Sequence, residues 1–320
     1  MHLLLAAVFL VSMAFEGSGR AEPSYFKADS AHDENRGDLW RPTVSFLLPG
    51  FDQYSAGHYG AGLGYTGLYL IGYEWAKRAD DNIDKFEDST LYRFASRDEQ
   101  ENFKTQRSVY QESTLANQIP FVAQGMSAYH AFRTSVESRR HSGQYKFLKR
   151  SLEETPLDIA LAPFQFEFLT RKTTLAPLAV VAGLAILSVN NKPEGYESAP
   201  LNLSDGGFIM GLSFNAGTNE EAIFRGWLMP YAYEYTDSYF LANVIQSGLF
   251  SLAHINQTEV PIIQLGLGYY LGWLTKENQW TIAESIFIHT WWDVFAFAMQ
   301  FSTRKKEAAA IWLPPLRLAF

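Results

Sequence analysis

The chain has 320 residues, 47% of them hydrophobic and 15% aromatic, no cysteine, and a formal net charge of −8 at pH 7. The absence of cysteine excludes thiol nucleophiles, disulfides and cysteine-type zinc sites, so Glu, Asp, His, Ser, Lys and Tyr must supply any chemistry. The acidic balance, without a sustained Lys/Arg run, argues against a nucleic-acid partner, because phosphate binding needs a concentrated basic face. The mean hydropathy of −0.12 averages a polar segment at 77–115 with a second half rich in apolar stretches.

The N-terminus carries an apolar run from Leu3 to Phe15, followed by small residues that end at Ala21. This pattern is typical of a signal peptide, and we assign residues 1–21 to it. Because no Lys or Arg precedes the run, an uncleaved anchor is the competing interpretation. Both interpretations place the chain on a membrane export route, and we expect it in a bacterial inner membrane.

Residues 22–150 form an N-terminal region to which the sequence assigns no activity. A Gly- and Tyr-rich apolar stretch from Gly60 to Trp75 predicts one membrane helix or a helical hairpin. The segment 77–115 is charged and has no apolar run long enough to cross a bilayer, so we expect a connecting segment in water or on the membrane surface. Residues 118–136 predict a moderately apolar helix, and the basic residues that follow it suit a cytoplasmic loop facing lipid head groups.

Two helix starts can be read in the second half of the chain. Thr155, Pro156 and Asp158 combine a capping hydroxyl, a proline at the first helical position and a carboxylate favoured by the helix dipole. We expect this helix to run to about Leu169. Thr281 and a glutamate three residues later have the spacing of a capping box, which predicts the start of the last helix there.

Apolar segments recur through the second half and are separated by short polar breaks. Each is read as a membrane helix. The segments are Thr173 to Val189, Phe208 to Tyr233, Tyr239 to Ile255, Pro261 to Leu274, and Ile282 to Phe301. The predicted fold class is therefore all-α, a polytopic transmembrane helix bundle with a polar N-terminal extension, and the predicted partners include the lipid bilayer.

Ionisable residues are few within these apolar segments, and they fall into three groups at 220–225, 250–254 and 289–293. A carboxylate costs several kcal/mol in a membrane helix, so such groups usually face a bundle interior or a water cavity and tend to be functional. Glu221 and Arg225 lie four residues apart, which predicts an ion pair on one helix face. Glu220 points about 100° away around the helix axis and remains available for chemistry.

His289 and Asp293 are also four residues apart. We expect them either to meet through a hydrogen bond that fixes the imidazole tautomer or to project together into one site. His254 adds a third polar group from another helix, and Glu220 with the two imidazoles can activate a water and stabilise an oxyanion at a peptide carbonyl. The same residues, Glu220, His254, His289 and Asp293, could instead hold a divalent metal such as Zn²⁺. Each group alone could be a packing residue or an interior ion pair, an alternative that weakens when all three groups occur together.

These residues resemble the three motifs of the CPBP family of intramembrane proteases, which includes the CAAX prenyl endoproteases of the Ras-converting type and bacteriocin-processing, Abi-type proteins. The motifs are Glu-Glu-x-x-x-Arg at 220–225, Phe-x-x-x-His at 250–254 and His-x-x-x-Asn/Asp at 289–293. The likeness covers about residues 173–302. It implies that Glu220 and His254 activate the attacking water, that His289 and Asp293 stabilise the oxyanion, and that Glu221, Arg225 and Phe250 support them.

The family more often has Asn at the position of Asp293, and an ionised Asp cannot donate a hydrogen bond to an oxyanion. This departure leaves three alternatives: a protonated Asp293, an orienting role towards His289, or metal ligation. The family is commonly described as metalloproteases, although its chemistry can also be written without a metal.

The resemblance implies an endopeptidase domain at 151–303, followed by a tail at 304–320, that acts on a membrane-bound protein or peptide. A noncatalytic binding or immunity protein that retains the fold is the main alternative. A proton or ion carrier would also explain the buried Glu and His residues, but it would not require the Glu-Glu-x-x-x-Arg spacing.

Overall fold

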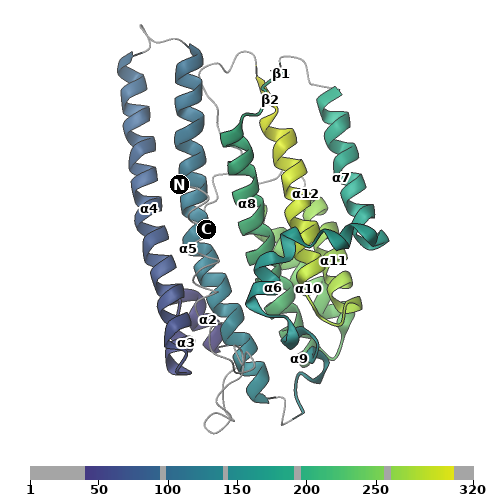
Figure 1. Cartoon of the computed structure of the whole chain (residues 1–320). Helices are drawn as coiled ribbons and strands as arrows, with labels where there is room; N and C mark the ends of the chain where they lie inside the picture. The colour runs from purple at the N-terminus through teal and green to yellow at the C-terminus, as the bar shows by residue number, and fades with distance from the viewer. Residues whose placement is uncertain (1–39, 94–98, 140–142, 191–195, 256–260, 306–320) are drawn as a thin grey trace.

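The computed structural model describes residues 40–93, 99–139, 143–190, 196–255 and 261–305. Within these ranges the chain forms a bundle of long helices with one short two-stranded pairing at one end (Figure 1). The all-α class predicted from the sequence is confirmed. The predicted signal peptide at 1–21 lies outside the described residues, as does most of the predicted tail.

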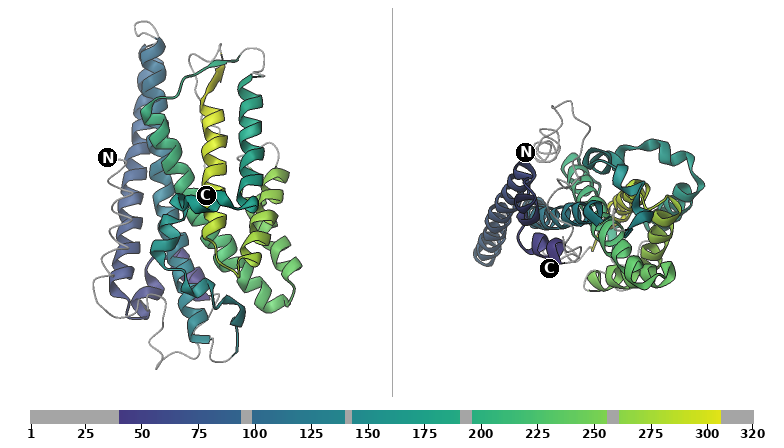
Figure 2. Two further views of the ribbon diagram at one scale, coloured as in Figure 1. Left: turned by 45° about the vertical axis from the view of Figure 1, so that its right-hand side comes forward. Right: turned by 90° about the horizontal axis from the view of Figure 1, so that it is seen from below.

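A long helical hairpin makes up the N-terminal part. The helices α4 (Tyr59–Arg93) and α5 (Glu99–Arg139) run side by side along one flank of the bundle (Figure 2). Two short helices, α2 (Trp40–Leu47) and α3 (Phe51–Ser55), pack against this hairpin. The turn between them requires glycine, because Gly50 has a φ of 97° and a Cβ there would lie 2.6 Å from a backbone oxygen.

The prediction of a connecting segment over 77–115 is wrong, because its described residues belong to α4 and α5. Small side chains at Ala76, Ala79 and Ala116 are buried between the two helices and let them approach closely. Of the charged residues in this segment, Lys77, Arg78 and Asp80 are exposed on α4, whereas Arg107 on α5 is buried and pairs with Asp205.

Helices of the C-terminal half lie close to their predicted positions. They are α7 (Lys172–Asn190), α8 (Leu203–Glu221), α9 (Met229–Thr236), α10 (Tyr239–Ala253), α11 (Pro261–Glu277) and α12 (Ala283–Phe301). The predicted segment 208–233 is divided, because a π-helix at Ala222–Leu228 separates α8 from α9. The strands β1 (Tyr196–Ser198) and β2 (Thr303–Lys305) pair antiparallel, so the approach to α8 lies beside the end of α12.

Short helical turns connect the hairpin to this half. They are 3₁₀ turns at Lys146–Leu148, Ser151–Glu153, Ala162–Phe164 and Phe166–Thr170, with the helix α6 (Pro156–Leu161) among them. The predicted cap at Thr155 is confirmed, since its hydroxyl accepts from the Asp158 N–H while the Asp158 carboxylate accepts from the Thr155 N–H. The predicted extension to Leu169 is wrong, because the regular helix ends at Leu161 and only 3₁₀ turns follow.

The predicted capping box at Thr281 is also wrong. No side chain of its own segment caps α12; instead the Glu154 carboxylate accepts from the backbone N–H groups of Ile282, at 2.9 Å, and Ala283, at 3.1 Å. The glutamate that suggested a capping box, Glu284, accepts hydrogen bonds from threonine hydroxyls and an asparagine, and pairs with Arg171.

The predicted membrane spans are not found. Among the helices formed by the described residues, none combines the length and the apolar character that crossing a membrane requires.

Candidate active site

The structure brings together the four residues predicted to act in catalysis. Glu220 lies at the end of α8, His254 directly follows α10, and His289 and Asp293 lie on α12. The Glu220 Oε2 atom is 3.6 Å from His254 Nε2 and 3.8 Å from His289 Nε2. His289 Nε2 is in turn 3.6 Å from Asp293 Oδ2. Two carboxylates and two imidazoles therefore surround one small space inside the bundle.

Glu221 and Arg225 form a fully buried ion pair beside this space. The Arg225 Nη1 donates to Glu221 Oε1 at 2.7 Å, and both side chains are 0% exposed, which confirms the predicted pair. Arg225 also donates to the carbonyl oxygen of Gly268 at 3.1 Å, and its guanidinium lies 4.5 Å from the centre of the Phe250 ring. A buried charge is tolerated only when it is paired and hydrogen-bonded, so these contacts are what allow both charges inside the bundle.

Glu221 has a second role that the sequence did not reveal. Its Oε1 atom lies 2.8 Å from His289 Nδ1, so the same carboxylate oxygen binds both Arg225 and the catalytic-site imidazole. The distance of 3.6 Å between His289 and Asp293 is too long for a direct hydrogen bond. Of the two predicted arrangements, the structure shows both side chains projecting into one site, with Glu221 as the hydrogen-bond partner that orients His289.

Each imidazole is held through its Nδ1 atom. His254 Nδ1 lies 2.7 Å from the carbonyl oxygen of Phe250, and His289 Nδ1 lies 2.8 Å from the Glu221 carboxylate. A carbonyl and a carboxylate can only accept, so Nδ1 carries a proton in both rings. When the rings are neutral, both Nε2 atoms present lone pairs to the space beside Glu220, which is the tautomer needed for proton transfer there.

Close helix contacts fix the position of Glu220. The wider turn of the π-helix begins directly after Glu221, and such turns occur frequently at functional sites. On α8, a Cβ at Gly217 would lie 2.9 Å from the Thr290 backbone nitrogen, so glycine allows α12 to approach. On α5, a Cβ at Gly125 would lie 2.1 Å from Asn219 Oδ1, so α5 also packs closely against α8 next to Glu220.

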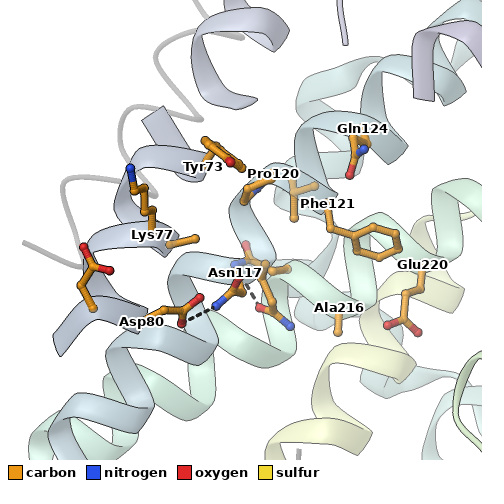
Figure 3. Close-up of a pocket in the computed structure, with 14 residues that line it drawn as sticks. Tyr73, Lys77, Asp80, Asn117, Pro120, Phe121, Gln124, Ala216 and Glu220 are labelled. Atoms are coloured by element: carbon orange, nitrogen blue, oxygen red, sulfur yellow. Dashed lines mark hydrogen bonds between the residues drawn. The ribbon is translucent and has the colours of Figure 1, made fainter. Parts of the chain in front are cut away.

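A cavity of about 420 Å³ reaches Glu220 from the side of the N-terminal hairpin (Figure 3). Its walls come from α4, α5 and α8, and Glu220 Oε2 is buried with no hydrogen-bond partner among the described residues. The lining residues are Tyr73, Ala76, Lys77, Asp80, Asp81, Asn117, Gln118, Pro120, Phe121, Val122, Gln124, Asn215, Ala216 and Glu220. The cavity offers a path for water or a substrate segment to this carboxylate.

Carboxylate oxygens and imidazole nitrogens are the donors that Zn²⁺ and related cations prefer, so the donor chemistry of the site is compatible with a metal. Among the described residues, however, no group of three or more His, Asp or Glu side chains is arranged to hold a metal ion. We derive no chemical step through a metal.

Comparison with known proteins supports the interpretation of the motifs. The family model described as Type II CAAX prenyl endopeptidase Rce1-like matches residues 203–295. No curated protein and no solved structure matches the chain. The matched segment runs from α8 into α12 and contains all three motifs, whereas α4 and α5 lie outside it. The resemblance inferred from the motifs is thereby confirmed for residues 203–295, which are similar to the type II CAAX prenyl endopeptidase family.

Proposed function

We propose that this protein is an endopeptidase that hydrolyses a peptide bond of a membrane-associated protein or peptide. The observation that carries the proposal is the convergence of Glu220, His254, His289 and Asp293 on one space, with both imidazole Nε2 atoms directed into it. The family match supports peptidase chemistry, and the geometry supports the assignment of roles to these side chains.

In the proposed mechanism, Glu220 and His254 activate a water. Their separation of 3.6 Å is too long for a direct hydrogen bond, and a water beside both atoms can contact each of them. The water gives a proton to Glu220 as its oxygen attacks the carbonyl carbon. The carbon–nitrogen bond then breaks, and the proton passes from Glu220 to the leaving amine, so the products are a carboxylic acid and an amine.

His289 stabilises the oxyanion in this mechanism. The Glu221 carboxylate accepts the Nδ1 hydrogen bond and favours a protonated ring, whose Nε2–H can then donate to the developing negative charge. Asp293, at 3.6 Å from the same Nε2, cannot donate to the oxyanion when it is ionised, so we assign it an electrostatic role in which its negative charge favours the protonated His289 ring. A zinc ion held by these residues is the alternative that metal analysis of the purified protein tests.

A membrane location is part of the proposal, and we place the protein in a bacterial inner membrane because of its apparent export signal. The bundle exposes many large apolar side chains on α7, α10 and α11. Among them are Val180, Leu184, Ile186, Leu187, Phe240, Leu241, Leu252, Ile262 and Ile263. Lipid contact would cover these side chains and bring membrane-bound substrates to the bundle.

The test is a proteomic comparison of membranes from cells that express the wild type or Glu220→Gln at equal levels. We expect some membrane proteins to be shortened only by the wild type, because general acid–base groups contribute about 10²–10⁴-fold to rates. The control is Glu277→Gln, which makes the same chemical change at the exposed end of α11 and should process substrates normally. Identical membrane proteomes for wild type and Glu220→Gln would contradict the peptidase assignment and favour a binding or immunity protein.

A further inference from the structure

The cavity at Glu220 is built largely by a part of the chain outside the family match. Its walls combine α4 and α5 with α8, whereas the match begins at residue 203. We propose that the α4–α5 hairpin forms the substrate-binding groove and selects polypeptide segments that carry a basic residue. This inference rests on the proposed function and assigns a role to the N-terminal region.

The groove has two distinct ends. Figure 3 shows Glu220 at one end, beside Phe121 and Ala216, and Lys77 and Asp80 at the other. Asn117 lies between these ends in the same view. A segment bound along the groove would therefore place one of its peptide bonds near Glu220 while its more distant residues contact α4.

Amide side chains along the walls suit the main chain of an extended peptide. Asn117, Gln118, Gln124 and Asn215 each carry a carbonyl oxygen and an NH₂ group, so they can bind both backbone N–H and C=O groups. Two of them hold each other across the helices, because Asn215 donates to Gln118 Oε1 at 3.3 Å. The groove thus offers main-chain recognition that does not depend on the side chains of the substrate.

Charge at the outer end gives the groove its selectivity. Lys77 is the only cation among the lining residues, against the carboxylates of Asp80, Asp81 and Glu220. Asp80 is held in place, since its Oδ1 accepts from Ser113 at 2.6 Å and from Asn117 at 3.2 Å. A preorganised carboxylate in a concave, net-negative site favours a Lys or Arg side chain.

The α5 wall also contacts the catalytic turn. Asn219, the residue before Glu220, donates to the carbonyl oxygen of Phe121 at 3.3 Å, and Gly125 lies against the same side chain. A segment seated along α5 is therefore positioned directly against the residue that carries the general base.

The test measures binding in a chain that cannot cleave. Full-length Glu220→Gln protein in detergent is titrated against three fluorescein-labelled extended peptides of equal length that differ only by one Lys, Gln or Glu. We expect the Lys peptide to bind most tightly. Asp80→Asn should weaken its binding about fivefold, because exposed ion pairs contribute modestly, and should leave the Gln peptide unchanged.

Asp84→Asn is the matched control, since it removes the same charge from an exposed position further along α4 that does not line the groove. Equal binding of the three peptides, no binding of any of them, or an equal loss with Asp84→Asn would overturn the inference. Because binding is read without cleavage, a failure of the peptidase assignment is seen separately in the proteomic comparison. Cleavage by the wild type without selective binding here would place substrate selection elsewhere.

Discussion

The α4–α5 hairpin and the α8–α12 bundle are both helical, but they bury different kinds of groups. Small apolar side chains such as Ala79 and Ala116 fill the contact between α4 and α5, whereas the buried cations of α5, Arg107 and Arg133, face other parts of the chain. The bundle instead encloses Glu221, Arg225 and His289 in its interior. Because buried charges are costly, the contrast indicates that the contact between α4 and α5 is structural and that the bundle sacrifices stability for chemistry.

The largest expected difference between the hairpin and the bundle is the stability that each loses when one of its ion pairs is broken. Arg225→Met leaves Glu221 buried without its cation and should lower the free energy of unfolding by about 3–5 kcal/mol. Arg78→Met breaks the exposed pair with Glu74 on α4, whose side chains are 73% and 54% exposed, and should cost less than about 1 kcal/mol. Denaturation of both variants in detergent measures the difference, and equal losses would contradict it.

Contact between the two regions is tested at Gly125 on α5. A methyl group there would displace Asn219 beside Glu220, so Gly125→Ala should destabilise the protein by about 1–3 kcal/mol and slow cleavage. Gly67→Ala on α4 is the control, since a Cβ at that position meets no atom within 4 Å. Unfolding and cleavage rates of both variants are compared. Full cleavage activity in Gly125→Ala would show that close packing of α5 against α8 is not needed for catalysis.

A pH-dependent contact links the connecting turns to α12. Burial raises the pKa of Glu154 from 4.5 to about 7, an effect that its backbone hydrogen bonds to Ile282 and Ala283 only partly offset. The folded state therefore holds this proton more tightly than the unfolded state, so its stabilising contribution is present below pH 4.5 and is lost as the pH rises to about 7.

The variant Glu154→Gln should make the free energy of unfolding less dependent on pH. We expect the wild type to lose roughly 1–3 kcal/mol of stability to this group between pH 4.5 and 7.5, and the variant to lose less. Unfolding curves at several pH values measure both slopes. Identical slopes would show that Glu154 does not titrate in this range.

Metal removal should have the smallest effect. In the proposed mechanism Glu220 and His254 activate the water without a metal, so cleavage of a processed substrate should change less than about twofold after treatment with a chelator. If the chelator abolished cleavage activity and added Zn²⁺ restored it, this expectation would be wrong and the site would bind a metal ion.

Local signals explain how much of the bundle could be predicted. The helices α7, α10, α11 and α12 follow apolar stretches bounded by polar breaks, and these positions were predicted within a few residues. The ion pair of Glu221 and Arg225 follows from a spacing of four residues. The α4–α5 hairpin could not be predicted, because its buried contacts are made by alanines scattered among charged residues and give no apolar run.

Contacts between distant segments could not be predicted. The hydrogen bond from His289 to Glu221 joins residues from different helices, and nothing in the sequence pairs them. The same holds for Glu154 as the cap of α12, which replaced a local capping box that the spacing had suggested. The π-helix after Glu221 has no reliable sequence signal, because it depends on how neighbouring helices pack.

The N-terminus of α8 shows how far the family-matched segment depends on the rest of the chain. Asp205, which is 1% exposed, lies 2.8 Å from Arg107 Nε and accepts a hydrogen bond from Gln111 at 2.9 Å, and both partners belong to α5. Residues 203–295 alone would lack both partners of this carboxylate and would lack Glu154, which caps α12. The matched segment therefore takes the partners of two of its helix starts, those of α8 and α12, from residues that precede it in the chain.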